Sequence, residues 1–234
     1  AQLVFLIMSQ LFKNFIGTTN ITGSAVTFKE CPTGKTLIFS GITTFNGNAS
    51  TVTQQVHMID ASESTSQTVE LGASYTITSN NAGFFTTKFV LEEGDKLGFE
   101  SDQDTQRISG SFVLLDSSSR TRYRHISKVV TTEDSFVDLI EAPAGHTIIM
   151  KHLFLKNKSG TNATGTDNEL RLIQATTNTF VPFARGTLNN DASASFGNTM
   201  VLEPGDKVQS RITEQPYHVS IFYQELPTPS VRGQ

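Results

Sequence analysis

Apolar and polar residues alternate in short runs along most of this chain, and Gly, Pro, Asn and Ser separate the runs. A period of two is typical of half-buried β-strands, and clusters of those four residues are typical of turns. No segment shows a sustained 3.6-residue apolar period with helix caps. The pattern predicts strands at Thr36–Ile42, Val52–Ile59, Phe84–Leu91, Ser109–Leu115, Thr147–Leu155, Asn168–Gln174, Gly197–Leu202 and Tyr217–Leu226.

Two sequence motifs occur twice with the same separation. Glu30–Ile38 recurs as Glu141–Ile149, and Val90–Leu97 recurs as Val201–Val208. The separation is the same for both, since 143 − 32 and 205 − 94 both equal 111. A constant offset over this span indicates a duplicated domain, and two domains of about 100 residues fit the length of 234.

The repeated motifs are predicted to be turns. A Pro-Gly pair supplies the φ near −65° and the positive φ that a type II turn requires, and an Asp after the glycine can hydrogen-bond its own turn. The first copy has Glu93 where the second has a proline, and the turn tolerates this change. The expected structural turn residues are Pro32, Gly34, Gly94, Asp95, Pro143, Gly145, Pro204, Gly205 and Asp206.

Many short strands, Gly/Pro turns and no helix predict an all-β chain with two tandem jelly-roll-like β-sandwich domains and an extended N-terminal arm. The predicted boundaries are an arm at 1–22, a first sandwich at 23–116, a linker at 117–134, a second sandwich at 135–227 and a tail at 228–234. The loops Asn46–Ser50 and Asn157–Thr161 differ between the copies. We expect such loops to vary without disturbing the core, so that each copy meets a different neighbour.

The N-terminal arm is unusually apolar for an exposed segment. We expect it to dock onto a neighbouring subunit, for instance by adding a strand to its sheet; the alternative is that it folds back on its own first sandwich. The residues proposed for docking are Leu3, Val4, Phe5, Leu6, Ile7, Leu11, Phe12, Phe15 and Ile16.

Charge and hydropathy limit the classes of partner. The net charge is −4 and the pI is about 5.7, which argues against a nucleic-acid partner. No run of about 18 apolar residues occurs, so no membrane partner is expected. The basic cluster Arg120–His125 falls in the predicted linker, where it is either solvated or a docking site for an acidic partner.

Candidate chemistry is sparse. Cys31 excludes an internal disulfide, and it occupies the position of Ala142 in the second copy, which favours a small structural residue over a reactive thiol. The acidic run Glu100–Asp104 is either a solvated loop or a cation site. The spacing of the histidines fits no metal or hydrolase motif. His152 is expected to face solvent from its strand. We expect no catalytic residue, no metal, no cofactor and no enzymatic activity; the histidines are His57, His125, His146, His152 and His218.

The second copy carries a longer recognisable pattern. It runs Ala-Pro-Ala-Gly-His-Thr with two apolar residues, then a strand ending in an Asn/Ser/Gly-rich loop, then Val-Leu-Glu-Pro-Gly-Asp-Lys. This pattern resembles small β-sandwich virion proteins of tailed bacteriophages, especially those of cyanophages and other marine phages. The resemblance covers Glu30–Leu115 and Glu141–Leu226, and the first copy departs from it at Cys31, Thr33 and Glu93.

The resemblance implies a non-enzymatic component of the phage virion. It would be a capsid decoration, a neck or phage-tail accessory, or a baseplate or fibre-attachment protein that contacts other virion proteins and forms a homo-oligomer. The alternative is a carbohydrate- or receptor-binding module at a tail tip or on a cell surface. Exposed tyrosines beside acidic and amide groups, such as Tyr75 or Tyr217, would favour that alternative.

Overall fold

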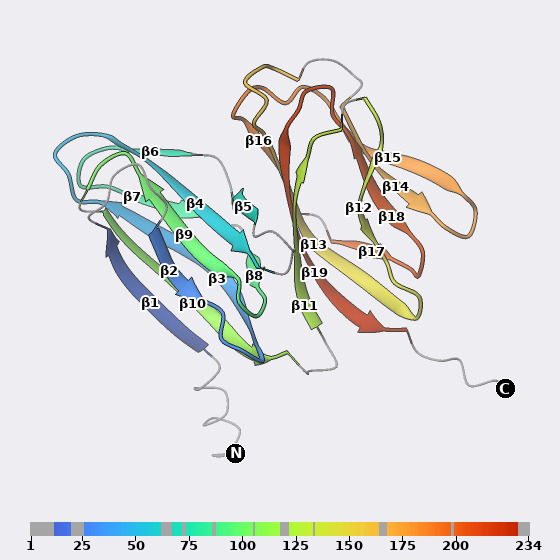
Figure 1. Cartoon of the computed structure of the whole chain (residues 1–234), viewed down its shortest axis with the longest axis horizontal. Helices are drawn as coiled ribbons and strands as arrows, with labels where there is room; N and C mark the ends of the chain where they lie inside the picture. The colour runs from blue at the N-terminus through green and yellow to red at the C-terminus, as the bar shows by residue number, and fades with distance from the viewer. Residues whose placement is uncertain are drawn as a thin grey trace. The chain divides into compact units, whose positions relative to one another are not determined.

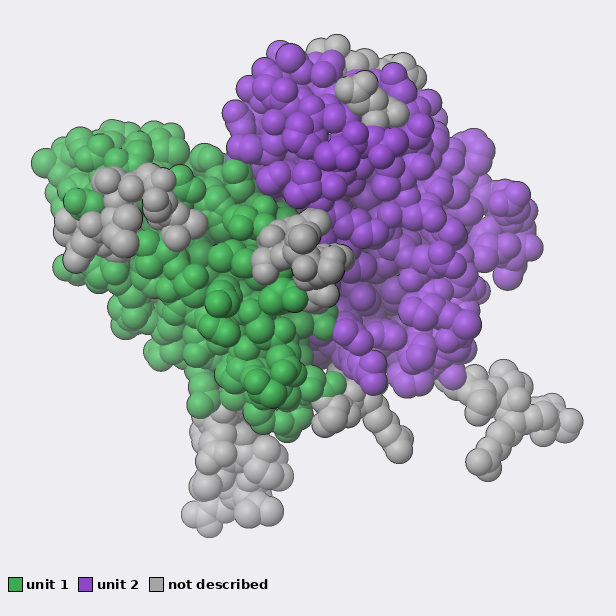
Figure 2. Space-filling model, viewed as in Figure 1, with its two compact units in different colours: residues 1–119 green, residues 120–234 purple. Residues whose placement is uncertain are grey.

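The chain consists of two compact units, residues 1–119 and 120–234 (Figure 2). A computed structural model describes residues 12–19, 26–61, 67–71, 74–85, 88–104, 106–117, 122–132, 134–163, 168–197 and 199–228. All helix- or strand-like structure in these ranges is β-strand, and the strands form antiparallel sheets in both units (Figure 1). The all-β prediction is therefore confirmed.

The first unit pairs its strands in two sheets. One has the order β1-β10-β3-β7, with β8 also pairing β3, and the other has the order β2-β9-β4-β5, with β6 also pairing β4. The strands are β1 (Phe12–Thr19), β2 (Val26–Glu30), β3 (Lys35–Asn46), β4 (Val52–Asp60), β5 (Gln67–Glu70), β6 (Tyr75–Ile77), β7 (Ala82–Phe85), β8 (Phe89–Leu91), β9 (Lys96–Ser101) and β10 (Gln106–Asp116).

The second unit has the same arrangement. Its sheets have the orders β11-β19-β13-β16, with β17 also pairing β13, and β12-β18-β14-β15. The strands are β11 (Arg122–Val130), β12 (Val137–Glu141), β13 (His146–Asn157), β14 (Glu169–Gln174), β15 (Thr179–Arg185), β16 (Ser193–Phe196), β17 (Met200–Leu202), β18 (Lys207–Arg211) and β19 (Tyr217–Pro227).

The duplication extends to strand register. Phe15 lies opposite Gly110 in the first unit, and Ile126 lies opposite Ile221, 111 residues further on, in the second. The strands β4 and β14 are displaced by three more residues, because Met58 faces Leu97 whereas Leu172 faces Val208, and 172 − 58 is 114. One backbone frame is therefore used twice, with a local insertion before β14.

The N-terminal segment is not a free arm where the structure describes it. Residues 12–19 form β1, an edge strand paired along its whole length with β10. The Phe15 ring meets Phe39 edge-on at 6.0 Å, and a Cβ built on Gly110 would lie 2.5 Å from the Phe15 ring. The strand thus packs on its own sandwich, as the alternative interpretation expected, because Phe15 fills the space that Gly110 leaves open.

The predicted linker at 117–134 is also wrong in its central part. Residues 122–130 form β11, which pairs with β19 and belongs to the second sandwich. Arg122–His125 therefore lie on a strand, and the Arg124 guanidinium is 3.4 Å from Glu225. Polar composition misled the prediction, because an edge strand with one wet face has few apolar residues.

Other strand predictions need smaller changes. The run Phe84–Leu91 is two strands, β7 and β8, which pair with successive parts of β3. Gly197–Leu202 contributes only the three residues of β17. The remaining predicted strands are present with ends shifted by one to four residues.

Each unit has its own apolar core between its two sheets. The first core is rich in phenylalanine, with Phe39 stacked on Phe89 at 4.5 Å. The second is mainly aliphatic and contains Tyr217, which is fully buried and hydrogen-bonds Ser210 at 2.7 Å.

Candidate functional site

The predicted turn residues lie at equivalent corners of the two sandwiches. Gly94 and Gly205 adopt φ values of 84° and 86°, and the N–H of the following aspartate donates to the carbonyl three residues back. Gly34 and Gly145 adopt 70° and 74° in the other pair of turns. Positive φ at the third turn position is what a type II turn requires, so these motifs stabilise the fold.

Asp95 and Asp206 bind the same groups in their own units. Asp95 accepts hydrogen bonds from the backbone N–H of Ala61 at 2.9 Å and of Glu92 at 2.8 Å. Asp206 accepts from Ala175 at 2.9 Å and Glu203 at 3.0 Å. The expectation that each aspartate bonds its own turn is confirmed, and each also fixes the end of a neighbouring strand. Burial raises the pKa of the Asp95 carboxyl to about 7, although the two N–H groups oppose this shift.

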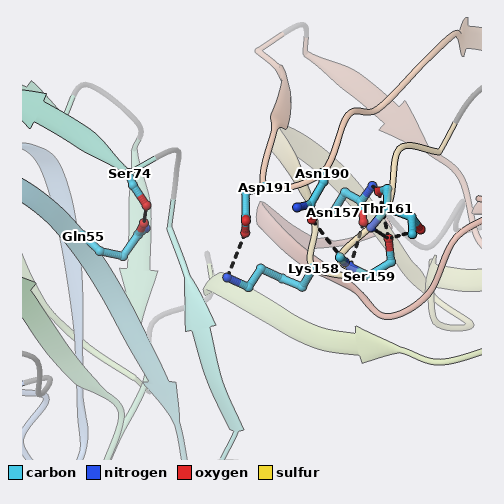
Figure 3. Close-up of polar contacts among 9 residues, drawn as sticks. Gln55, Ser74, Asn157, Lys158, Ser159, Thr161, Asn190 and Asp191 are labelled. Atoms are coloured by element: carbon cyan, nitrogen blue, oxygen red, sulfur yellow. Dashed lines mark hydrogen bonds and ion pairs between the residues drawn. The ribbon is translucent and has the colours of Figure 1, made fainter.

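The Asn/Ser/Gly loops are less free to vary than expected. The Asn157 amide donates to the carbonyls of Thr161 and Leu188, both at 2.8 Å, and its oxygen accepts from the Ser159 N–H at 2.9 Å (Figure 3). Asn157 is fully buried. The first residue of the loop is therefore part of the frame, and only the exposed positions after it can vary.

The docking residues predicted in the arm are only partly described. Ile16 is 80% exposed on β1, whereas Phe15 is half-buried. Phe12 begins the same strand. Six of the predicted residues lie outside the described ranges: Leu3, Val4, Phe5, Leu6, Ile7 and Leu11.

The candidate chemical groups are mostly engaged in structural contacts. Cys31 is 2% exposed, and burial raises the pKa of its thiol to about 12, which removes the thiolate needed for reactivity. His152 is half-buried rather than solvent-facing, its Nε2 lies 2.7 Å from the Ser195 hydroxyl, and burial lowers its pKa. His125 contacts the Ser220 hydroxyl at 2.7 Å.

Each unit has a pocket at the same place in its fold, beside the residue pair formed by β4 or β14 and the segment that follows the next strand. In unit 1 the pair is Gln55 and Ser74, with Ser74 Oγ donating to Gln55 Oε1 at 2.5 Å (Figure 3). In unit 2 the equivalent pair is Glu169 and Arg185, joined by an ion pair whose closest N–O distance is 2.6 Å. Glu169 is only 5% exposed, so Arg185 neutralises a nearly buried carboxylate.

The linings of the two pockets differ. The unit 1 pocket has a volume of about 200 Å³ and an entirely polar lining, formed by Thr53, Gln54, Gln55, Glu70, Ser74, Glu100, Ser101 and Asp102. The unit 2 pocket has a volume of about 130 Å³, and most of its lining is apolar, including Leu155, Leu170, Leu188, Phe196 and Ile212. The acidic run Glu100–Asp104 therefore borders a pocket, which the sequence did not predict.

The outer face of the β12-β18-β14-β15 sheet carries an arginine and phenylalanine cluster. The Arg171 guanidinium lies 3.3 Å from the centre of the Phe136 ring and 5.0 Å from that of Phe180, and Arg211 lies 4.9 Å from Phe136. Arg171 also donates twice to Gln209 Oε1. Sequence reasoning missed this cluster because its members come from three separate segments, and their only shared signal is alternation along each strand.

The two tyrosines named for glycan binding do not form an exposed platform. Tyr217 lies in the core of unit 2. Tyr75 is half-buried and meets Phe85 edge-on at 6.3 Å.

Among the residues that the structure describes, no three His, Cys, Asp or Glu side chains gather closely enough to hold a metal ion. The same residues contain no helix with the length and apolar character to cross a membrane.

Comparison with known proteins gives remote structural neighbours only. No protein-family profile matches the chain, and no curated protein sequence matches it. Among solved structures, it is similar to the tandem CBM22 domains of Xyn10C from Paenibacillus barcinonensis, with 11% identity, 93% of this chain and 91% of that chain covered, and a TM-score of 0.26.

Two further neighbours are viral. The major capsid protein P2 of bacteriophage PM2 has 12% identity, 95% and 100% coverage and a TM-score of 0.31. A protein of the IBDV T13 particle has 9% identity and the same TM-score, with 94% of this chain covering 41% of that one. At these scores the likeness carries no argument about function.

Proposed function

We propose that this chain is a non-enzymatic structural protein of a tailed-phage virion. It would serve as an accessory, adaptor or decoration component of the head, neck or tail, and it would assemble through protein–protein contacts. The sequence resemblance to small phage β-sandwich proteins supports this proposal, because the motifs that carry it are turns that hold both sandwiches together.

One observation carries the proposal: the frame is kept in both repeats while the side chains on one face change charge. The hydrogen bonds of Asp95 recur at Asp206. On the outer face, however, Glu100 is replaced by Arg211 at the equivalent register position. A duplicated rigid frame with two different faces suits a component that joins unlike neighbours.

Glycan binding is the second candidate function. The all-polar lining of the unit 1 pocket favours it, since amide and carboxylate oxygens can accept hydrogen bonds from sugar hydroxyls. The burial of Tyr217 counts against it, because that ring cannot stack on a sugar. Binding of the purified chain to a glycan array, lost on Gln54→Ala, would support this candidate.

Immunogold electron microscopy of purified particles tests the structural role. Antibodies raised separately against unit 1 and unit 2 should label particles at one defined location. Absence of label from intact and mildly disrupted particles, with the protein detected only in the free fraction of the lysate, would reject the proposal.

A further inference from the structure

The two units carry faces of opposite charge at equivalent positions. Glu100 on β9 faces Gln55 on β4, and Arg211 on β18 faces Glu169 on β14, in the same cross-strand register. With Glu70 and Asp102, Glu100 makes the unit 1 pocket acidic, and no lysine or arginine lines that pocket. We call these three carboxylates the acidic face and define the basic face as Arg171, Arg185 and Arg211.

The basic face has the composition of a protein interface. Phe180 is 56% exposed beside Arg171, and Val181 on the same edge strand is 59% exposed. Arginine and aromatic side chains are enriched at the centres of interfaces and supply most of their binding energy. The Arg185 side chain remains 54% exposed despite its ion pair with Glu169, so its guanidinium can reach a second carboxylate.

The acidic pocket contains an acceptor that lacks a donor. Gln54 lines the pocket and is 1% exposed, and its Oε1 accepts no hydrogen bond within the described residues. Its amide nitrogen is already committed to Gln106 at 2.5 Å. Buried acceptors are nearly always satisfied, and a guanidinium carries five N–H donors and no acceptor. An arginine entering the pocket would therefore satisfy Gln54 and the carboxylates together.

We propose that copies of this chain associate head to tail, with the basic face of unit 2 on one copy bound to the acidic face of unit 1 on the next. Charge complementarity identifies the occupant as a second copy, because every copy carries both faces. Such a contact is heterologous, so each added copy exposes another free face, and association continues until a ring closes or a filament forms. This inference deepens the proposed structural role by naming one partner.

A charge-exchange experiment with the purified full chain tests this interface. Light scattering should show the wild-type mass rising above the 25.6 kDa monomer with concentration at low salt and falling toward it at high salt. Glu100→Arg and Arg211→Glu should each weaken association about tenfold or more. An equimolar mixture of the two variants should associate again, because each then offers the face that the other lacks.

Glu203→Arg is the matched control. It makes the same charge change at an exposed turn outside both faces, and it should associate like the wild type. Because Arg211→Glu places a carboxylate opposite Glu169, the thermal transition of each variant is recorded, and Phe180→Ser provides a second, charge-neutral disruption of the basic face.

A wild type that stays monomeric at all concentrations in low salt would overturn the inference. So would folded charge variants that associate like the wild type, or a mixture that does not recover. The result is independent of the particle experiment, since a chain absent from virions could still self-associate, and a virion protein could remain monomeric in solution.

Discussion

Asn46 and Asn157 lie 111 residues apart and close the same loop in each repeat. The Asn46 amide donates to the carbonyls of Ser50 at 2.8 Å and Ile77 at 3.0 Å, and Asn157 makes the two equivalent bonds in unit 2. Both side chains are fully buried. Since a buried amide must be satisfied, this side chain fixes the loop as firmly as a strand pairing would.

Replacing either asparagine by alanine should destabilise its own unit. The change leaves two buried carbonyls and one N–H without partners, so we expect a loss of roughly 2–4 kcal/mol in the free energy of unfolding. Urea denaturation of Asn46→Ala and Asn157→Ala measures it. Asn80→Ala, at an exposed turn residue, is the control for general loop effects. Equal stability of the buried-site variants and the wild type would show that the loops are not anchored in this way.

Truncation should distinguish the segment before β1 from β1 itself. Deleting residues 1–19 removes the whole edge strand and the contact of Phe15 with Phe39, so unit 1 should lose roughly 2–3 kcal/mol or more. Deleting residues 1–11 leaves β1 intact and should change the melting curve little. If the predicted docking of Leu3–Leu11 is correct, the shorter deletion should nevertheless abolish incorporation into particles. Normal incorporation would reject the docking hypothesis.

The Glu169–Arg185 pair should be exchangeable for its counterpart in unit 1. Arg185→Ser alone leaves a carboxylate that is 5% exposed without its cation and should cost about 1–3 kcal/mol. Adding Glu169→Gln recreates the Gln55–Ser74 pair and should restore most of the loss. Chemical denaturation of the single and double variants gives both values. Additive losses in the double variant would mean that the two positions are not equivalent.

Asp95 should make the stability of unit 1 depend on pH. Burial raises the pKa of its carboxyl from 3.8 to about 7. The unfolded chain releases this proton near its ordinary pKa, whereas the folded unit retains it to about pH 7. The contribution of this group is therefore fully present below pH 3.8 and is lost as the pH rises through about 7.

Urea denaturation at a series of pH values checks the effect. Asp95→Asn should reduce the fall in stability between about pH 4 and 7, since its amide does not titrate over that range. Asp206→Asn reports the cost of the altered hydrogen bonds at the equivalent position of unit 2. An unchanged pH dependence in Asp95→Asn would assign the effect to another group.

The sequence predicted the duplication, the all-β class and the turns because these depend on local signals. A glycine at a positive φ and an aspartate beside it leave a direct trace, as at Gly94 and Asp95. Strands β1 and β11 were missed because an edge strand with a wet face resembles a polar linker or an exposed arm. Tyr217 was misplaced because a tyrosine whose hydroxyl finds Ser210 can be buried without penalty.

The pockets and the Arg171 cluster could not be predicted, because their members meet only through sheet register. Gln54 and Glu100 lie on β4 and β9, and a single slip in either strand would turn one of them to the other face. The three-residue insertion before β14 also conceals the equivalence of Gln55 with Glu169 from a comparison at constant offset.

The most direct test of the structural role is the copy number of this protein in gradient-purified particles, measured by quantitative mass spectrometry against the major capsid protein. The account predicts a fixed ratio that is unchanged through repeated purification and salt washing, with peptides from both units equally abundant. A ratio that falls toward zero with each wash would contradict it and show that the chain is not a component of the virion.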